Sequence, residues 1–196
     1  ASNTDGLETL SAERVGAEMR KLLCAPDPAP ALAAMRQTGV LGTILPGSDD
    51  RWMAMLVHFE GLLGLQANWI WRLAALGGED TANRLRLSKA DTRMFENIRS
   101  AAFEGKSLSE IAYRHGVEIA QGAMLLRACL AESPPETSVL ETINSAIQAK
   151  FPVRAKDLIH AYQGPALGAR LAQLEAAWIA SNFHATQETL LDMPDT

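Results

Sequence analysis

Apolar residues recur at intervals of three and four along most of this chain, most clearly near its C-terminus. Leu167, Leu171, Leu174 and Trp178 follow a Gly-Pro pair at that spacing, which is the repeat of one face of an α-helix. No segment combines strict alternation, enrichment in β-branched residues and hairpin turns, so no strand is predicted. The sequence therefore predicts an all-α protein of about nine to eleven short helices.

Serine residues mark the expected starts of several helices. Ser11, Ser88 and Ser107 each precede a segment with helical periodicity, and a serine there accepts a hydrogen bond from a free N–H of the first turn. Residues 50–77 are nearly continuous apolar helix, which we expect to break near Gly64. The Ser-Pro-Pro linker at 133–135 predicts a helical body before it and a tail module from residue 133 to residue 196.

Composition excludes several classes of protein. Hydrophobic residues make up 47% and charged residues 21% of the 196 residues, as in a globular domain. No apolar run approaches the roughly 20 residues of a membrane span, so no membrane partner is expected. Cys24 and Cys129 are far apart in sequence, which argues against a disulfide framework and favours a reducing cytoplasm.

Recognisable catalytic and metal-binding motifs are missing from the sequence. The four histidines are not at ligand spacing with one another or with a cysteine, so no metal site is predicted. No GxSxG, HExxH, phosphate-binding loop or dinucleotide-binding fingerprint is present. By itself this chain is expected to be catalytically inert.

Positive charge is concentrated locally although the chain carries a net charge of −5. Residues 84–106 hold six cations against three acids, and Lys150, Arg154 and Lys156 form a second basic stretch. Phosphate binding needs such a local excess of cations. Gly164 opens the C-terminal helix, whose free N–H groups and positive dipole end would suit a phosphate.

Residues 107–129 offer a different interpretation, a helix-turn-helix with Gly116 in the turn. Its second helix would present Glu118, Ile119, Ala120 and Gln121 where a recognition helix needs hydrogen-bond donors. A DNA-binding regulator therefore remains an alternative, as does a helical scaffold that binds protein.

Four segments, in this order, resemble one family. They are LSAERVGAEMRKLL at residues 10–23, APDPAPALAAMRQTGVLGTILP at 25–46, RLRLSKAD at 84–91, and FPVRAKDLI with GPALGARLAQLEAAWI between 151 and 179. Together they resemble the class II tRNA nucleotidyltransferases, meaning CCA-adding enzymes and bacterial poly(A) polymerases. The first segment is similar to the ERxxxEL-type end of the family's neck, with Met19 where leucine is usual.

This resemblance implies the end of a neck at 1–24, a body at 25–132 and a tail at 133–196. The catalytic head, with its Mg²⁺ and its CTP or ATP, would precede these residues in the parent enzyme. The family's EDxxR motif is not found in residues 1–10, so we expect the chain to start after it. CCA addition to tRNA is favoured over poly(A) synthesis.

The resemblance also gives roles to individual residues. Glu13, Arg14 and Glu18 would support the nucleotide pocket of the head through ion pairs. Body and tail would hold tRNA or another RNA mainly by its phosphates. From their charge, and for the glycine from its position at a helix start, the RNA-binding candidates are Lys89, Arg93, Lys150, Arg154, Lys156, Gly164 and Arg170.

Overall fold

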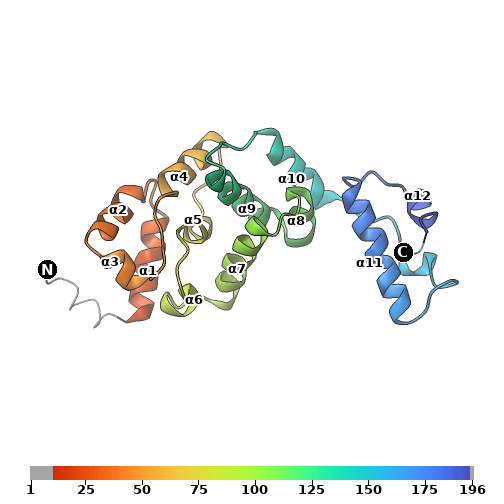
Figure 1. Ribbon diagram of the computed structural model, residues 1–196, viewed down its shortest axis with the longest axis horizontal. Coiled ribbons are helices and arrows are strands. Elements are labelled where there is room, and N and C mark those ends of the chain that lie inside the picture. The colour runs from red at the N-terminus through yellow and green to blue at the C-terminus, as the bar shows by residue number, and fades with distance from the viewer. Residues whose placement is uncertain (1–10, 195–196) are drawn as a thin grey trace.

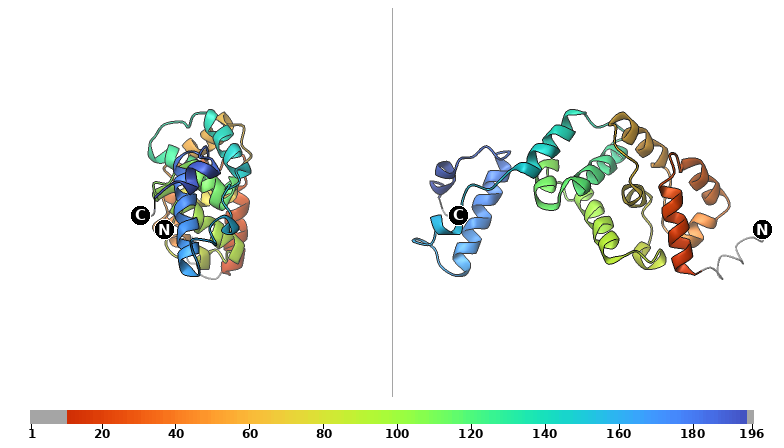
Figure 2. Two further views of the ribbon diagram at one scale, coloured as in Figure 1. Left: turned by 90° about the vertical axis from the view of Figure 1, so that its right-hand side faces the viewer. Right: turned by 180° about the vertical axis from the view of Figure 1, so that it is seen from behind.

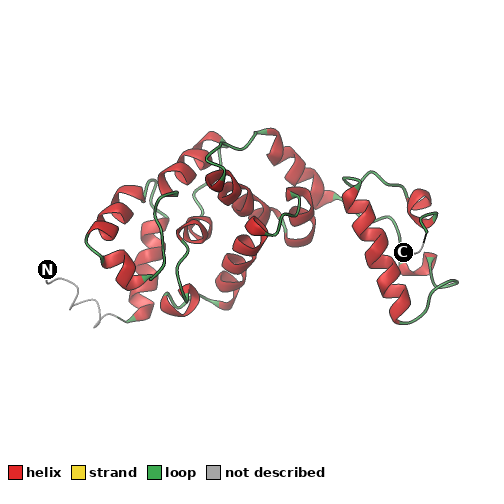
Figure 3. Cartoon of the chain, in the orientation of Figure 1, coloured by secondary structure: helices red, strands yellow, loops and turns green. Residues whose placement is uncertain are grey.

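The structure is a computed structural model that describes residues 11–194. Within that range it contains only helices and loops, apart from one isolated β-bridge (Figure 3). The helices are α1 (Ala12–Leu23), α2 (Ala29–Gln37), α3 (Val40–Ile44), α4 (Met53–Leu62), α5 (Trp69–Leu76), α6 (Thr81–Arg84), α7 (Lys89–Phe103), α8 (Leu108–His115), α9 (Val117–Leu130), α10 (Ser138–Gln148), α11 (Pro165–Ala180) and α12 (Gln187–Leu191), with a 3-10 helix at Ala155–Asp157.

The predicted all-α class is confirmed. The twelve α-helices of residues 11–194 slightly exceed the predicted number, because the connector after α2 and the end of the chain form helices of only five residues. The first ten residues of the predicted neck segment lie outside the described residues.

The predicted helix starts are confirmed by their capping hydrogen bonds. The hydroxyl of Ser11 accepts from the N–H of Arg14 at 3.4 Å, and that of Ser88 accepts from Asp91 at 3.1 Å. Ser107 caps α8 in the same way, at 3.1 Å. The predicted break near Gly64 is also present, because α4 ends at Leu62 and α5 begins at Trp69.

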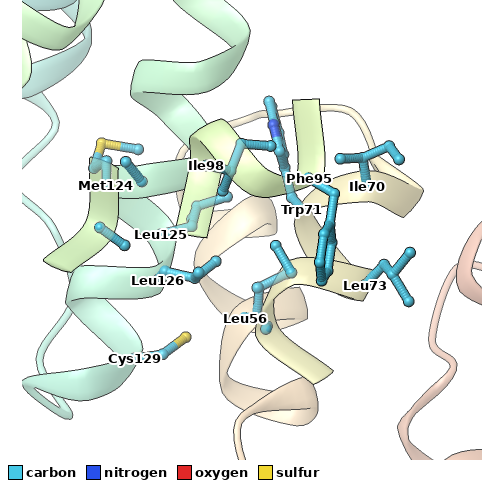
Figure 4. Packing of buried hydrophobic residues seen from close by; sticks show 14 of the residues in the cluster. Leu56, Ile70, Trp71, Leu73, Phe95, Ile98, Met124, Leu125, Leu126 and Cys129 are labelled. Carbon is cyan, nitrogen blue, oxygen red and sulfur yellow. The ribbon is translucent and has the colours of Figure 1, made fainter. Parts of the chain in front are cut away.

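Helix α9 lies at the centre of the main hydrophobic core (Figures 1 and 4). It packs against α4, α5, α7, α8 and α10. The indole N–H of Trp71 on α5 donates to the carbonyl of Glu118 at 2.9 Å. A Cβ at Gly122 would lie 2.6 Å from Cδ1 of Trp71 and 3.1 Å from a side-chain carbon of Ile98. The absence of a side chain at Gly122 thus allows α5 and α7 to reach α9 closely.

A buried ion pair fixes the end of α1 to α4 and α5. Arg72 and Glu60 are 2% and 3% exposed, and the guanidinium donates from Nε and Nη2 to one carboxylate oxygen at 3.1 and 2.7 Å. The same guanidinium donates to the carbonyl of Leu23 at 2.8 Å and to those of Ala25 and Pro26. One side chain therefore joins α5 to α4, to the end of α1 and to the loop that follows α1. Burial raises the pKa of Glu60.

Packing puts the boundary between body and tail later than the linker at 133–135 indicates. Helix α10 packs against α8 and α9, and its Ile143 and Ala146 are buried in the main core. A second core begins at Val153 and contains Leu174 and Trp178 of α11. By this criterion α10 belongs to the body and the tail starts near residue 149. A Ser-Pro-Pro run marks a loop, but the body core continues beyond it.

The molecule is elongated and narrow, with the tail at one end (Figures 1 and 2). Tyr113 of α8 connects the tail to the body. Its ring packs against Trp178 and Phe183 with centroids 5.5 and 5.6 Å apart, and its hydroxyl donates to Glu175 at 2.8 Å. Phe183, which has a positive φ of 65°, packs against both cores.

Candidate nucleic-acid interface

The first turns of α7 present two of the predicted RNA-binding cations. Lys89 and Arg93 are four residues apart and both are exposed, so they lie on the same face of the helix. Neither has an ion pair within residues 11–194. Their charge is thus available to a ligand in solution.

Other cations near α7 are already engaged. Arg86 pairs with Glu13 of α1 at 3.3 Å, and Arg20 pairs with Asp91 at 4.0 Å. Arg99 donates to the carbonyl of Ala74 at 2.8 Å and is part-buried. The positive excess of residues 84–106 is consequently smaller on the surface than in the sequence.

A cleft of about 350 Å³ opens between α7 and the junction of α8 with α9. Arg93 and Asn97 line it from α7, and Arg114 and His115 line it from the end of α8. Arg114 already forms ion pairs with two acids, Glu110 at 3.0 Å and Glu175 of α11 at 3.4 Å. The structure thus brings one predicted cation, Arg93, together with basic residues that had not been predicted.

The second basic stretch lies on the connection from α10 to the tail, separate from α7 (Figure 1). Lys150, Arg154 and Lys156 are all exposed. The backbone N–H of Arg154 donates to the carboxylate of Asp157 at 2.8 Å, which orders the turn and leaves the arginine side chain outside. The three cations have no ion pair in the described part of the chain.

Arg170 does not belong to an exposed cationic surface. Its side chain is 5% exposed, and its guanidinium donates to Gln173 at 2.7 Å, to the carbonyl of Pro194 at 3.0 Å and to that of Met193. Arg170 thus fastens the end of the chain to α11. We remove it from the RNA-binding candidates because these contacts and its burial keep the guanidinium from a phosphate.

Gly164 stands at the start of α11, as predicted, with a φ of 55°. It is exposed, and the helix has proline at its first position. Proline has no N–H, so one of the donors that a phosphate would use is missing. The phosphate role of Gly164 stays a prediction.

The three predicted neck residues lie on α1 and are exposed. Glu13 pairs with Arg86 at 3.3 Å. Hydrogen bonds from the backbone and from Ser11 lower the pKa of Glu13. Arg14 and Glu18 line a cavity of about 600 Å³ whose other walls are mainly apolar, and neither has an ion pair within residues 11–194. Their support of a nucleotide pocket stays a prediction.

The position of α9 contradicts the helix-turn-helix alternative. Gly116 does separate α8 from α9, but nine residues of α9 are buried, from Ile119 to Cys129. A recognition helix must expose one face to the major groove. Since α9 is surrounded by the helices of the body, it cannot enter a groove in this fold.

The described residues show no metal centre and no membrane span. No group of three or more His, Cys, Asp or Glu side chains among them is placed to hold a metal ion. In the same range, no helix is both long and apolar enough to cross a bilayer.

Burial, with a further contribution from Glu60, raises the pKa of the Cys129 thiol to about 12, so Cys129 remains an inert thiol at neutral pH.

Residues 1–51 match the family model described as "Probable RNA and SrmB- binding site of polymerase A". This end of the chain is similar to a poly(A) polymerase RNA-binding region. The match includes α1, α2 and α3 and supports RNA as a partner. No curated protein and no solved structure matches the chain.

Proposed function

We propose that this chain is the RNA-binding neck end, body and tail of a nucleotidyltransferase that extends the 3′ ends of RNA. The observation that carries the proposal is the match of residues 1–51 to the RNA-binding region of poly(A) polymerases. The segments at 84–91 and 151–179 resemble the same enzymes and lie beyond the matched residues. The proposal thus extends the likeness from α1–α3 to the remaining helices.

Charge distribution supports two places of contact with RNA. Residues 11–51 contain as many cations as acids, so they provide little electrostatic attraction of their own. The unpaired cations Lys89 and Arg93 on α7, and Lys150, Arg154 and Lys156 before α11, supply it instead. An RNA that reaches both sets would be held by its phosphates along the body and tail.

Catalysis is assigned to a head domain of the parent enzyme. Two-metal nucleotidyl transfer requires carboxylates that converge on both ions, and the described residues hold no such group. The proposal therefore places Mg²⁺ and the CTP or ATP outside residues 11–194. Among possible activities we favour CCA addition to tRNA, with adenylate addition as the alternative, in a cytoplasmic enzyme.

Titration with labelled tRNA at several salt concentrations tests the proposal. We expect the logarithm of the observed association constant to fall linearly with the logarithm of the salt concentration, as phosphate neutralisation requires. Duplex DNA of equal charge should bind more weakly. Absence of tRNA binding at low salt would refute the RNA-binding function.

The variant R154Q/K156Q tests the tail segment. It removes two cations, so the salt slope should fall by about 1.5 and the affinity at low salt by about tenfold. The control Q37E/Q66E changes the net charge by the same amount at exposed positions on and after other helices. Equal losses in both variants would show a general charge effect and remove Arg154 and Lys156 from the interface.

Protein binding is a second candidate function, favoured by the cavity on α1. Val15, Leu22, Met35 and Ile44 form its apolar walls, and its region matches a family model that names a protein partner, SrmB, beside RNA. A pull-down with purified SrmB, compared between wild type and L22E, would test this role. Capture that is unchanged by L22E would exclude the cavity as the docking site.

A further inference from the structure

The cleft between α7 and α8 combines unused hydrogen-bond donors from two helices. Arg93, Asn97 and His115 line it, and none of their side chains has a hydrogen bond or ion pair within the described residues. A guanidinium, an amide and an imidazole all donate hydrogen bonds. Their placement around one cleft suits an anionic group with several oxygen acceptors.

Acids around the cleft limit the amount of negative charge it can take. Arg114, the fourth polar lining residue, is held by Glu110 and Glu175, and Glu104, whose pKa is lowered mainly by Lys106 and to a lesser extent by His115, is close to the imidazole. These carboxylates repel a run of closely spaced phosphates. A single phosphate beside Arg93 remains favourable, since charge-assisted hydrogen bonds are stronger than neutral ones.

The rest of the cleft wall is apolar. Ala90 and Met94 of α7 and Ile119 of α9 provide it, so hydrocarbon lies directly beside the polar donors. The volume of about 350 Å³ is at the lower end of the range of about 300–1,000 Å³ found for small-molecule pockets. Such a space has room for one nucleotide and excludes a nucleic-acid helix.

We propose that this cleft binds one nucleotide of single-stranded RNA, with its phosphate at Arg93, Asn97 and His115 and its base against Met94 and Ile119. This inference rests on the proposed RNA-binding function and names the form of RNA that the cleft takes. Bases of a single strand are free to turn outward and pack on a protein surface, whereas paired bases are stacked inside the helix. The cleft therefore selects unpaired RNA.

Two substitutions in the full chain separate this site from general electrostatic binding. A90L adds three carbons to the cleft wall at an exposed helix position and changes no charge. R93Q removes the cation at the cleft. R84Q is the matched control, because Arg84 is also exposed and lacks an ion pair within residues 11–194, but does not line the cleft.

The assay is fluorescence anisotropy with a labelled 12-nucleotide single-stranded RNA and with a 12-base-pair RNA duplex. We expect A90L and R93Q each to weaken single-strand binding by about five- to tenfold, and R84Q by less than about twofold. A90L should leave duplex binding unchanged. Circular dichroism spectra and thermal midpoints of all variants should match those of wild type, since the three positions are exposed.

The outcomes distinguish failure of the cleft from failure of the proposed function. If wild type binds RNA but A90L has no effect, or R84Q weakens binding as much as R93Q, the cleft is not a nucleotide site. Equal loss of duplex and single-strand binding in A90L would also overturn it. If wild type binds neither RNA at low salt, both proposals fall.

Discussion

Replacing Arg72 by methionine should destabilise the body more than any other single arginine substitution we consider. Methionine has a similar length and no charge, so R72M removes the hydrogen bonds to Glu60 and to the carbonyls of Leu23, Ala25 and Pro26. Breaking a buried ion pair from one side costs about 3–5 kcal/mol. Water can reach the carbonyl groups near Pro26, which is exposed, but not that of Leu23.

The expected total for R72M is about 5 kcal/mol, against a typical free energy of unfolding of about 5–15 kcal/mol. Because burial raises the pKa of Glu60, the folded protein holds that proton more tightly than the unfolded chain does. The contribution of Glu60 to stability thus falls as pH rises from its ordinary value of 4.5 through the folded-state value. Arg72 lowers the pKa of Glu60 against the larger effect of burial, so its loss raises that pKa further and lets Glu60 take up a proton more readily. The destabilisation caused by R72M should therefore be smaller at pH 5 than at pH 7.5.

Urea unfolding followed by tryptophan fluorescence and circular dichroism measures these differences. The double variant E60M/R72M should recover about 2 kcal/mol relative to R72M, because no uncompensated carboxylate remains in the core. R86M, which breaks an exposed ion pair, should be close to wild type. If R72M does not fold, R72K can replace it. Lysine keeps the charge but lacks the several N–H donors of the guanidinium, so its free energy of unfolding should fall by less than that of R72M. A loss below about 1 kcal/mol in R72M, or no recovery in E60M/R72M, would refute this account of the core.

Two further predictions concern helix contacts. In G16A the new Cβ would lie 2.1 Å from the carbonyl oxygen of Leu85, so the free energy of unfolding should fall by about 1–3 kcal/mol. In G168A nothing lies within 4 Å of the new Cβ, so the higher helix propensity of alanine should raise the free energy of unfolding by about 0.5–1 kcal/mol. Equal effects of the two variants in urea unfolding would contradict the close approach of Gly16 to Leu85. Burial and Glu175 raise the pKa of Tyr113 to about 12. Y113F should speed hydrogen exchange in α11, cost about 1 kcal/mol and reduce the rise in absorbance at 295 nm above about pH 11. Unchanged exchange would show that the hydroxyl does not anchor the tail.

Local features of the fold were predictable because they depend on residues close in sequence. A serine three residues before a free N–H is sufficient to place the starts of α1, α7 and α8. Likewise, the face of α11 formed by Leu174 and Trp178 follows from their spacing. Such signals need no knowledge of which helices pack together.

Tertiary packing accounts for what the sequence did not reveal. Helix α10 follows a Ser-Pro-Pro linker, yet its apolar face meets α8, and no local signal distinguishes that partner from the tail. Arg170 was grouped with surface cations, although it is four residues before Leu174 and eight before Trp178. That spacing puts it on the buried face, so its burial could have been predicted.

The cleft was only partly predictable. Arg93 was a candidate from its charge, whereas Asn97, Arg114 and His115 had no motif to mark them. Arg114 and His115 end α8 just before Gly116, a position where basic residues commonly stabilise the negative end of a helix. Only the three-dimensional arrangement shows that they face α7.

Phe183 has a consequence for how firmly the tail is attached. Its backbone is in the left-handed region, where a bulky residue is strained by about 1–3 kcal/mol. Contacts with Tyr113 and Trp178 hold it there. The N–H of Phe183 also donates to the carbonyl of Trp178 at 3.0 Å, so contacts inside the tail are sufficient to keep this conformation when the tail separates from α8. The Phe183 ring therefore stays in place for Tyr113 when the junction opens, and reclosing requires no rearrangement of the tail backbone at this residue.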